Sequence, residues 1–235
     1  FEYEAEIDNL LWRGDGDMRL FQAVHEVKRE SRMARERSED ALTSNVFRYL
    51  EKHSLLAPSL AALIGSPVTD PQLIYWSYSA VDRGTWTWLA KARAEFGERP
   101  QRSSEPDLIV ASNEALFFIE PKFTSDNKTR PSNPHDTKQY LTGGEEWYQK
   151  VFRSDYHTVA VREKRYELLR FWLLGSWIAA QLNVAFCLVN LVREGHERDI
   201  EQQFSRHIVT SGQSSFLRWA WEEIYRFVRD QAPVY

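Results

Sequence analysis

The chain has 235 residues, 43% of them hydrophobic and 27% charged, with a formal net charge of −4. This length and composition are those of one globular domain with a sizeable core, and they argue against disorder. The acidic balance argues against a protein that coats nucleic acid non-specifically, but it does not exclude a local basic groove. The only cysteine, Cys187, cannot form an internal disulfide, so a reducing, cytoplasmic setting is expected.

The first 37 residues begin acidic and then turn basic, through Lys28, Arg29, Arg32, Arg35 and Arg37. Mixed signs at this density are typical of a solvated helix, and an arm that touches phosphates is the alternative. Ser38 is a plausible N-cap for a helix over residues 39–53. Its inward stripe is expected to consist of Leu42, Val46 and Tyr49/Leu50.

The next segments alternate between surface, strand and helix. Pro58 and residues 65–71 punctuate a surface segment, after which we expect a strand over residues 73–78 and a helix over residues 85–96. Core packing is the favoured role of Trp76, Trp86 and Trp88, although an aromatic ring at a groove rim can stack on a base. Residues 97–104 form a basic loop that carries Arg99 and Arg102.

Two apolar runs, residues 108–111 and 115–119, flank Asn113-Glu114. They predict two short strands joined by a two-residue turn. Counting outward from that turn places Asp107 directly opposite Glu120, and Glu105 opposite Lys122. Because side chains alternate along a strand, Asp107, Glu120 and Lys122 are expected on one face.

Charges among such apolar strands need partners, because burying a charge is costly. Two carboxylates suit a hard divalent cation such as Mg²⁺ or Mn²⁺, and Lys122 is placed to hold or polarise an attacking water. The alternative is a surface salt bridge between a carboxylate and Lys122.

Pro106-Asp107, followed after a short strand by Glu120-Pro121-Lys122, resembles the signature of the PD-(D/E)XK nuclease superfamily. That superfamily includes restriction endonucleases and nucleases of recombination and repair. The resemblance covers residues 38–181 and implies a restriction-endonuclease-like α/β fold, a three-layer core in which a central mixed β-sheet is flanked by helices. Pro121 departs from the usual pattern and predicts an edge strand or a bulge at that point.

The resemblance also implies roles for individual residues. Asp107, Glu120 and the backbone carbonyl of Pro121 would hold the metal ion, and Lys122 would position or deprotonate the water. A glutamate on the helix before the hairpin often faces the metal in this superfamily. Glu39 falls where that residue would lie, and its competitors are Asp40 and Glu51.

Substrate contacts are expected from the segments after Lys122. The loop over residues 123–134 carries Lys128 and Arg130, and simple solvent exposure is the alternative for both. A short helical piece over residues 135–141 ends at Gly143-Gly144. Its Gln139, beside Tyr140, loosely resembles a site-supporting glutamine of some recombination exonucleases.

The strongest predicted helix covers residues 163–181. Arg170 lies inside its apolar stripe and needs a carboxylate or phosphate partner, and an internal salt bridge is favoured over substrate contact. Residues 171–192 carry no charge, but a buried helix followed by a buried strand over residues 184–192 is favoured over a membrane span. Residues 214–229 are expected to form a closing amphipathic helix.

These expectations describe one domain over residues 1–235, with a helical extension (1–37), a catalytic core (38–192) and a C-terminal helical closure (193–235). The expected function is a Mg²⁺-dependent deoxyribonuclease, a restriction-type endonuclease of bacterial defence or DNA processing. A catalytically inactive module of the same fold that binds nucleic acid or a protein is the alternative. DNA is the expected partner, no membrane contact is expected, and a homodimer stays open.

Overall fold

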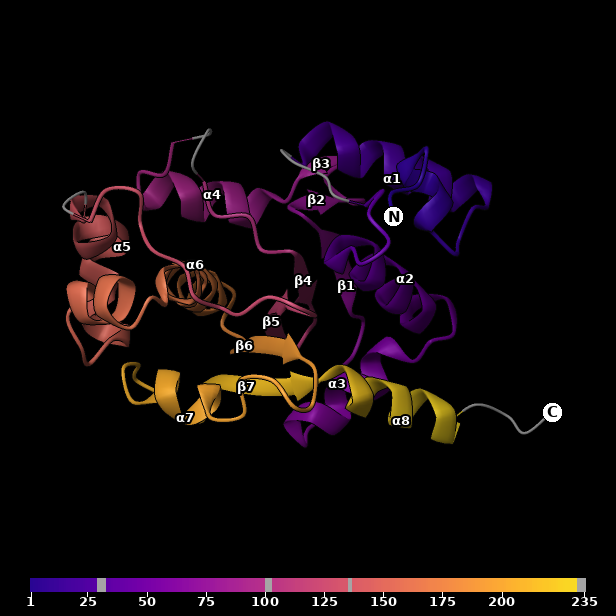
Figure 1. Cartoon of the computed structure of the whole chain (residues 1–235). Helices are drawn as coiled ribbons and strands as arrows, with labels where there is room; N and C mark the ends of the chain where they lie inside the picture. Colours follow the sequence, from indigo (N-terminus) through magenta and orange to yellow (C-terminus); the bar gives the residue numbers. More distant parts are fainter. Residues whose placement is uncertain (29–32, 100–102, 135–136, 232–235) are drawn as a thin grey trace.

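The computed structural model describes residues 1–28, 33–99, 103–134 and 137–231. Within these residues a mixed seven-stranded sheet, in the order β3-β2-β1-β4-β5-β6-β7, lies between two layers of helices (Figure 1). Neighbouring strands from β3 to β5 pair antiparallel, whereas β5, β6 and β7 run parallel. The expected α/β fold with a central mixed sheet between helices is confirmed.

The strands are β1 (Gln72–Tyr75), β2 (Tyr78–Ser79), β3 (Gly84–Thr85), β4 (Leu108–Ala111), β5 (Ala115–Pro121), β6 (Ala185–Val192) and β7 (Ser214–Ala220). One face packs on a 3₁₀ turn η1 (Glu6–Asn9) and on helices α1 (Asp15–Val27), α2 (Glu39–Lys52), α3 (Leu56–Ile64) and α8 (Trp221–Gln231). The other face packs on α4 (Thr87–Glu95), α5 (Lys138–Val151), a π-helical turn η3 (His157–Arg162), α6 (Tyr166–Leu182) and α7 (Ile200–Ser205).

The hairpin of β4 and β5 has the predicted register. Leu108 lies opposite Ile119, and the Ser112 N–H donates to the Ala115 carbonyl at 3.0 Å. Continuing this register by one residue pairs Asp107 with Glu120. Both strands are buried in the middle of the sheet, so a one-residue slip would exchange the side chains that pack against the two helical layers.

The expected edge strand or bulge at Pro121 is wrong, because β5 is an interior strand paired on both sides. Lys122 donates its N–H to the Leu191 carbonyl of β6, so the alternation directs the backbone N and O of Pro121 toward β4. The residue opposite Pro121 on that side is Pro106, which lies before β4 begins. The hydrogen-bond ladder between β4 and β5 thus ends at two prolines, Pro106 and Pro121. Because neither has an N–H group, no backbone donor is left unpaired at this position.

The uncharged stretch behaves as predicted. Helix α6 lies in the core, and β6 follows it as a strand buried on both faces. Among the described residues, no helix has the length and apolar character needed to cross a membrane.

The strand expected over residues 73–78 is confirmed up to Tyr75 in β1 and wrong beyond it, because the chain reverses at Trp76-Ser77. Both turn residues have positive φ, 43° and 77°, which is rare for residues with side chains. Hydrogen bonds hold the turn: the Trp76 N–H donates to the Asp107 carbonyl at 3.0 Å, and the Arg93 guanidinium donates to the Ser77 hydroxyl at 2.7 Å. The tryptophan is thereby brought beside β4.

The closing helix expected over residues 214–229 is also wrong in its first half, which forms β7. Phe216 packs into the core on the α6 side of the sheet, and Trp219 packs into the core on the α2 side. A spacing of three residues puts two side chains on one side of a helix but on opposite faces of a strand. The open edge of β6 supplies the partner that selects the strand.

Helix α2 has its predicted cap, since the Ser38 hydroxyl accepts from the Ala41 N–H at 3.1 Å. Its predicted inward stripe is shifted, however. The buried residues are Ala41, Thr43, Phe47 and Leu50, whereas Leu42, Val46 and Tyr49 are only partly buried and line an apolar groove against α8.

The segment at Pro58 differs from expectation, whereas the helix end at Gly143-Gly144 agrees with it. The surface segment at Pro58 contains α3, in which the proline lies in the first turn, where no helical N–H bond is lost. The first helical stretch of α5 ends at Gly143-Gly144 as predicted, because residues 143–146 have non-helical backbone angles, and a second helical stretch follows them. A Cβ on Gly143 would lie 2.6 Å from the Phe96 ring, so the glycine permits close packing on α4. Residues 135 and 136 of the predicted helical piece lie outside the described residues.

Candidate functional site

One edge of the sheet collects the residues that the sequence singles out. Strands β1 and β5 end at this edge and β4 begins there, because β4 is antiparallel to both. A cavity of about 520 Å³ opens at the edge. Acidic and basic side chains line it together: Glu39, Asp40, Glu105, Asp107 and Glu167, with Lys28, Arg35, Arg37, Lys122 and Arg170.

Asp107 and Glu120 face each other at the base of this site. Asp107 lines the cavity, and its carboxylate accepts a hydrogen bond of 2.9 Å from the Trp76 indole N–H. The Glu120 side chain is only 3% exposed and contacts the Lys122 ammonium. The hairpin therefore brings the two carboxylates and the lysine together as predicted.

Burial dominates the electrostatics of the two carboxylates. It raises the pKa of Asp107 from 3.8 to about 6, although the Lys122 and Lys28 ammonium groups oppose the shift. Burial also raises the pKa of Glu120 well above its ordinary value, and the neighbouring Asp107 adds to this rise. The positive charge near these two carboxylates is therefore too small to offset the cost of burying both in ionised form.

Lys122 supplies part of that positive charge. Its ammonium contacts Glu120 and lies 3.7 Å from a Glu167 carboxylate oxygen. Burial disfavours the charged form, but the carboxylates of Glu120, Asp107 and Glu167 outweigh it and raise the pKa of Lys122 above its ordinary value. The side chain is therefore a fixed ammonium, suited to holding an anion or a water oxygen rather than to accepting a proton.

Glu167 belongs to the site and was missed from the sequence. It lies in the first turn of α6, lines the cavity and approaches Lys122. Its separation of three residues from Arg170 was the available signal, since both then share one side of the helix. Arg170 was predicted to need a carboxylate or phosphate partner, but Glu167 was not identified as a site residue.

Glu39 reaches the cavity wall, but its carboxylate serves the backbone. Oxygen Oε1 accepts from the N–H groups of Phe123, Thr124 and Ser125 at 2.7, 2.9 and 3.2 Å. Although burial opposes the shift, these hydrogen bonds lower the pKa of Glu39. The residue anchors the chain directly after Lys122.

The two competitors of Glu39 differ in position. Asp40 lines the cavity, and its carboxylate lies 3.4 Å from the Lys28 ammonium. Glu51 instead pairs with Arg48 on α2 and does not line the cavity. Asp40 is thus the nearer additional acid.

The four predicted substrate contacts are dispersed. Arg170 lines the cavity but pairs at 3.2 Å with Glu98, the internal salt bridge that the sequence favoured. Gln139 lines a separate, smaller pocket with Tyr140 and Tyr166. Lys128 is exposed and pairs with Asp126 at 2.8 Å, and Arg130 is exposed.

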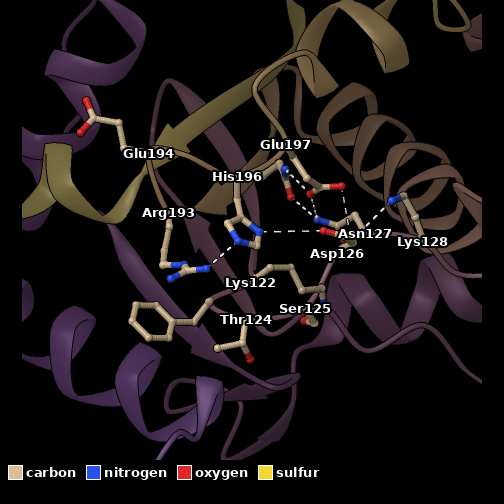
Figure 2. A network of polar contacts seen from close by, with 12 residues as sticks. Lys122, Thr124, Ser125, Asp126, Asn127, Lys128, Arg193, Glu194, His196 and Glu197 are labelled. Atoms are coloured by element: carbon tan, nitrogen blue, oxygen red, sulfur yellow. Dashed lines mark hydrogen bonds and ion pairs between the residues drawn. The ribbon is translucent and has the colours of Figure 1, made fainter.

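A buried polar network fixes the loop after β5 (Figure 2). The Glu197 carboxylate accepts from the Asn127 N–H at 3.2 Å and from the Asn190 amide at 3.1 Å. Arg165 donates to the Asn127 carbonyl at 2.8 Å and to Glu197 at 3.0 Å. The network connects this loop to β6 and to the start of α6. It therefore orders the backbone that directly follows Lys122.

Within the described residues, no three His, Cys, Asp or Glu side chains are grouped so as to hold a metal ion. The site therefore consists of a carboxylate pair, a lysine and additional charges on the cavity wall. Compared with protein-family models, curated proteins and solved structures, the chain matches none. Fold and site define an α/β protein with a mixed sheet and a charged cavity at the edge where β5 ends.

Proposed function

We propose that the protein is a metal-dependent nuclease that hydrolyses phosphodiester bonds of DNA on a restriction-endonuclease-like fold. The observation that carries this proposal is the pairing of Asp107 with Glu120, with Lys122 on the same face, at a cavity that Lys28, Arg35 and Arg37 also line. A binding site for a phosphodiester needs both features, since acids hold a cation and bases hold the phosphate.

The chemistry of the donors fits a hard divalent cation. Asp107 and Glu120 offer carboxylate oxygens, and the burial that raises both pKa values is the condition that a bound cation relieves. The Pro121 carbonyl cannot receive a ladder hydrogen bond from Pro106, which leaves it suited to act as a third oxygen ligand. Mg²⁺ or Mn²⁺ held there would supply Lewis acidity at the scissile phosphate.

The protein's own groups do the remaining work. Released from Glu120 when that carboxylate takes a cation, the Lys122 ammonium would orient the attacking water and offset charge on the phosphate. Glu167, 3.7 Å away, would hold the lysine in place. Glu39 would order the backbone after Lys122 instead of binding the first ion.

The test is cleavage of supercoiled plasmid and of labelled single-stranded and duplex oligonucleotides, with Mg²⁺, Mn²⁺ or EDTA. Wild type is compared with Lys122→Met and with Lys91→Met, a matched control whose lysine is exposed and does not line the cavity. We expect metal-dependent products from wild type and the control, and a rate lower by about 100-fold or more for Lys122→Met. Near wild-type cleavage by Lys122→Met would remove the lysine from the mechanism.

The inactive binding module remains a second candidate, favoured by one observation. The Lys122 ammonium rests on Glu120, the carboxylate that a cation would need. Calorimetry separates the two functions: saturable Mg²⁺ or Mn²⁺ binding that is lost in Asp107→Asn supports the nuclease. Nucleic-acid binding without any metal binding supports the module.

A further inference from the structure

A second lysine lies at the cavity, on the side away from Lys122. Lys28 directly follows α1, and its side chain is only 5% exposed although it lines the cavity. Its ammonium lies 4.1 Å from the centre of the Trp76 ring and 3.4 Å from an Asp40 carboxylate oxygen. A lysine normally keeps its ammonium in water, so this placement is unusual.

The sheet order places the two lysines on either side of Asp107. Trp76 follows β1, Asp107 precedes β4 and Lys122 follows β5, and these strands are adjacent in the order β1-β4-β5. Lys28 packs on Trp76, whose indole N–H donates to Asp107. Lys28 and Lys122 both oppose the upward pKa shift of Asp107, so both ammonium groups act on the same carboxylate.

Two arginines, Arg35 and Arg37, line the cavity together with Lys28. Arg35 and Arg37 are exposed, line the same cavity and form no ion pair with any carboxylate in the part of the chain that the structure describes. Guanidinium groups that form no ion pair with a described carboxylate can bind phosphate oxygens.

We propose that Lys28 binds a backbone phosphate of the nucleic acid, so that the substrate strand is held between Lys28 and Lys122 with Arg35 and Arg37 extending the contact. This inference rests on the proposed function and assigns the phosphate-binding wall of its site. In the free protein the Lys28 ammonium pairs with the Asp40 carboxylate. When the nucleic-acid strand binds, a phosphate oxygen replaces that carboxylate as the partner of Lys28.

The test measures binding of a labelled DNA duplex in EDTA, where no metal-dependent cleavage occurs, over a range of salt concentrations. Lys28→Met keeps an apolar stem on Trp76 and removes the charge. We expect about tenfold weaker binding at low salt and a salt slope smaller by about 0.9, the value for one phosphate contact. Lys91→Met is the matched control, because Lys91 lies 4.3 Å over the Trp88 ring but does not line the cavity.

A double variant separates phosphate binding from a mere ion pair. Lys28→Met/Asp40→Asn removes both charges and leaves the net charge unchanged. If Lys28 touches phosphate, the double variant still binds weakly with the reduced slope. Recovery of wild-type affinity and slope would overturn the inference, because Lys28 would then only neutralise Asp40.

Two more outcomes complete the test. Lys28→Arg keeps the charge and is expected to bind within a few-fold of wild type, and thermal melting checks that each variant is folded. If Lys28→Met does not fold, Asp40→Asn replaces it: tighter DNA binding supports the inference and unchanged binding overturns it. Wild type that neither binds nor cleaves any oligonucleotide would overturn the proposed function and this inference together, whereas cleaving wild type with an unaffected Lys28→Met would overturn the inference alone.

Discussion

Trp76 contacts Asp107 twice, through its backbone N–H to the carbonyl at 3.0 Å and through its indole N–H to the carboxylate at 2.9 Å. The turn between β1 and β2 thus holds Asp107, one of the two carboxylates of the proposed metal site. The backbone of Trp76 is strained, because a φ of 43° is rare for a residue other than glycine. Such strain persists where the surrounding contacts hold the residue in place. Trp76 is a positioning residue for Asp107.

Replacing Trp76 by Phe tests this relationship. The variant keeps a ring beside Lys28 but removes the donor that favours the ionised carboxylate, so the pKa of Asp107 should rise further. Carbon-detected NMR titration of the Asp107 carboxyl measures the shift. Trp86→Phe, a buried tryptophan in the core on the opposite face of the sheet, should leave it unchanged. An unaltered titration in Trp76→Phe would contradict the positioning role.

Asp107→Asn should stabilise the metal-free protein at neutral pH. Because the pKa of Asp107 is raised from 3.8 to about 6, its protonated form favours folding, and that stability is lost as pH rises through about 6. The asparagine cannot ionise and should gain on the order of 2 kcal/mol at pH 7 relative to wild type. Urea unfolding at several pH values in EDTA measures the difference. A less stable variant would instead indicate that the charge serves a structural salt bridge.

Lys122→Met should be strongly destabilising, because it leaves the buried Glu120 carboxylate without its cation. Removing one partner of a buried pair costs about 3 kcal/mol or more. Adding Glu120→Gln should restore most of the lost stability, while cleavage stays abolished in the double variant. Chemical unfolding of both variants, compared with their plasmid cleavage, separates the contribution to folding from the contribution to catalysis.

Glu39→Gln should loosen the chain after Lys122 without abolishing metal binding. An amide replaces the carboxylate that accepts from Phe123, Thr124 and Ser125. The cost should be about 1 kcal/mol once partial solvent exposure is allowed for. Since the pKa of Glu39 is lowered, its contribution is present above the ordinary value of 4.5 and falls as pH drops below it. Calorimetry showing lost Mg²⁺ affinity would assign Glu39 to the metal instead.

Gly175→Ala should destabilise the contact between α6 and β6. A Cβ at this position would lie 2.2 Å from the Phe186 ring, too close for either element to accommodate without shifting. We expect a loss of about 2 kcal/mol, in the range of overpacked cores. Gly16→Ala in α1 is the control, since its Cβ meets nothing within 4 Å and should add up to about 1 kcal/mol of stability. Thermal melting of the two variants measures the expected loss of stability in Gly175→Ala and the expected gain in Gly16→Ala.

The sequence by itself determined the local parts of this protein. The turn at Asn113-Glu114 defines the pairing of Asp107 with Glu120 by counting, because the length of a hairpin loop fixes the register of the two strands that it joins. The cap at Ser38 and the buried helix and strand of the uncharged stretch are equally local patterns, and all were predicted correctly.

Only the tertiary structure decided how distant segments meet. The reversal at Trp76 depends on a hydrogen bond to Asp107, and β7 depends on the open edge of β6. Lys28 directly after α1 and Glu167 in α6 reach the cavity from opposite faces of the sheet, 139 positions apart in the sequence (167 − 28). Contacts between segments this far apart are selected by packing and burial energies of the whole core, which no window of neighbouring residues contains.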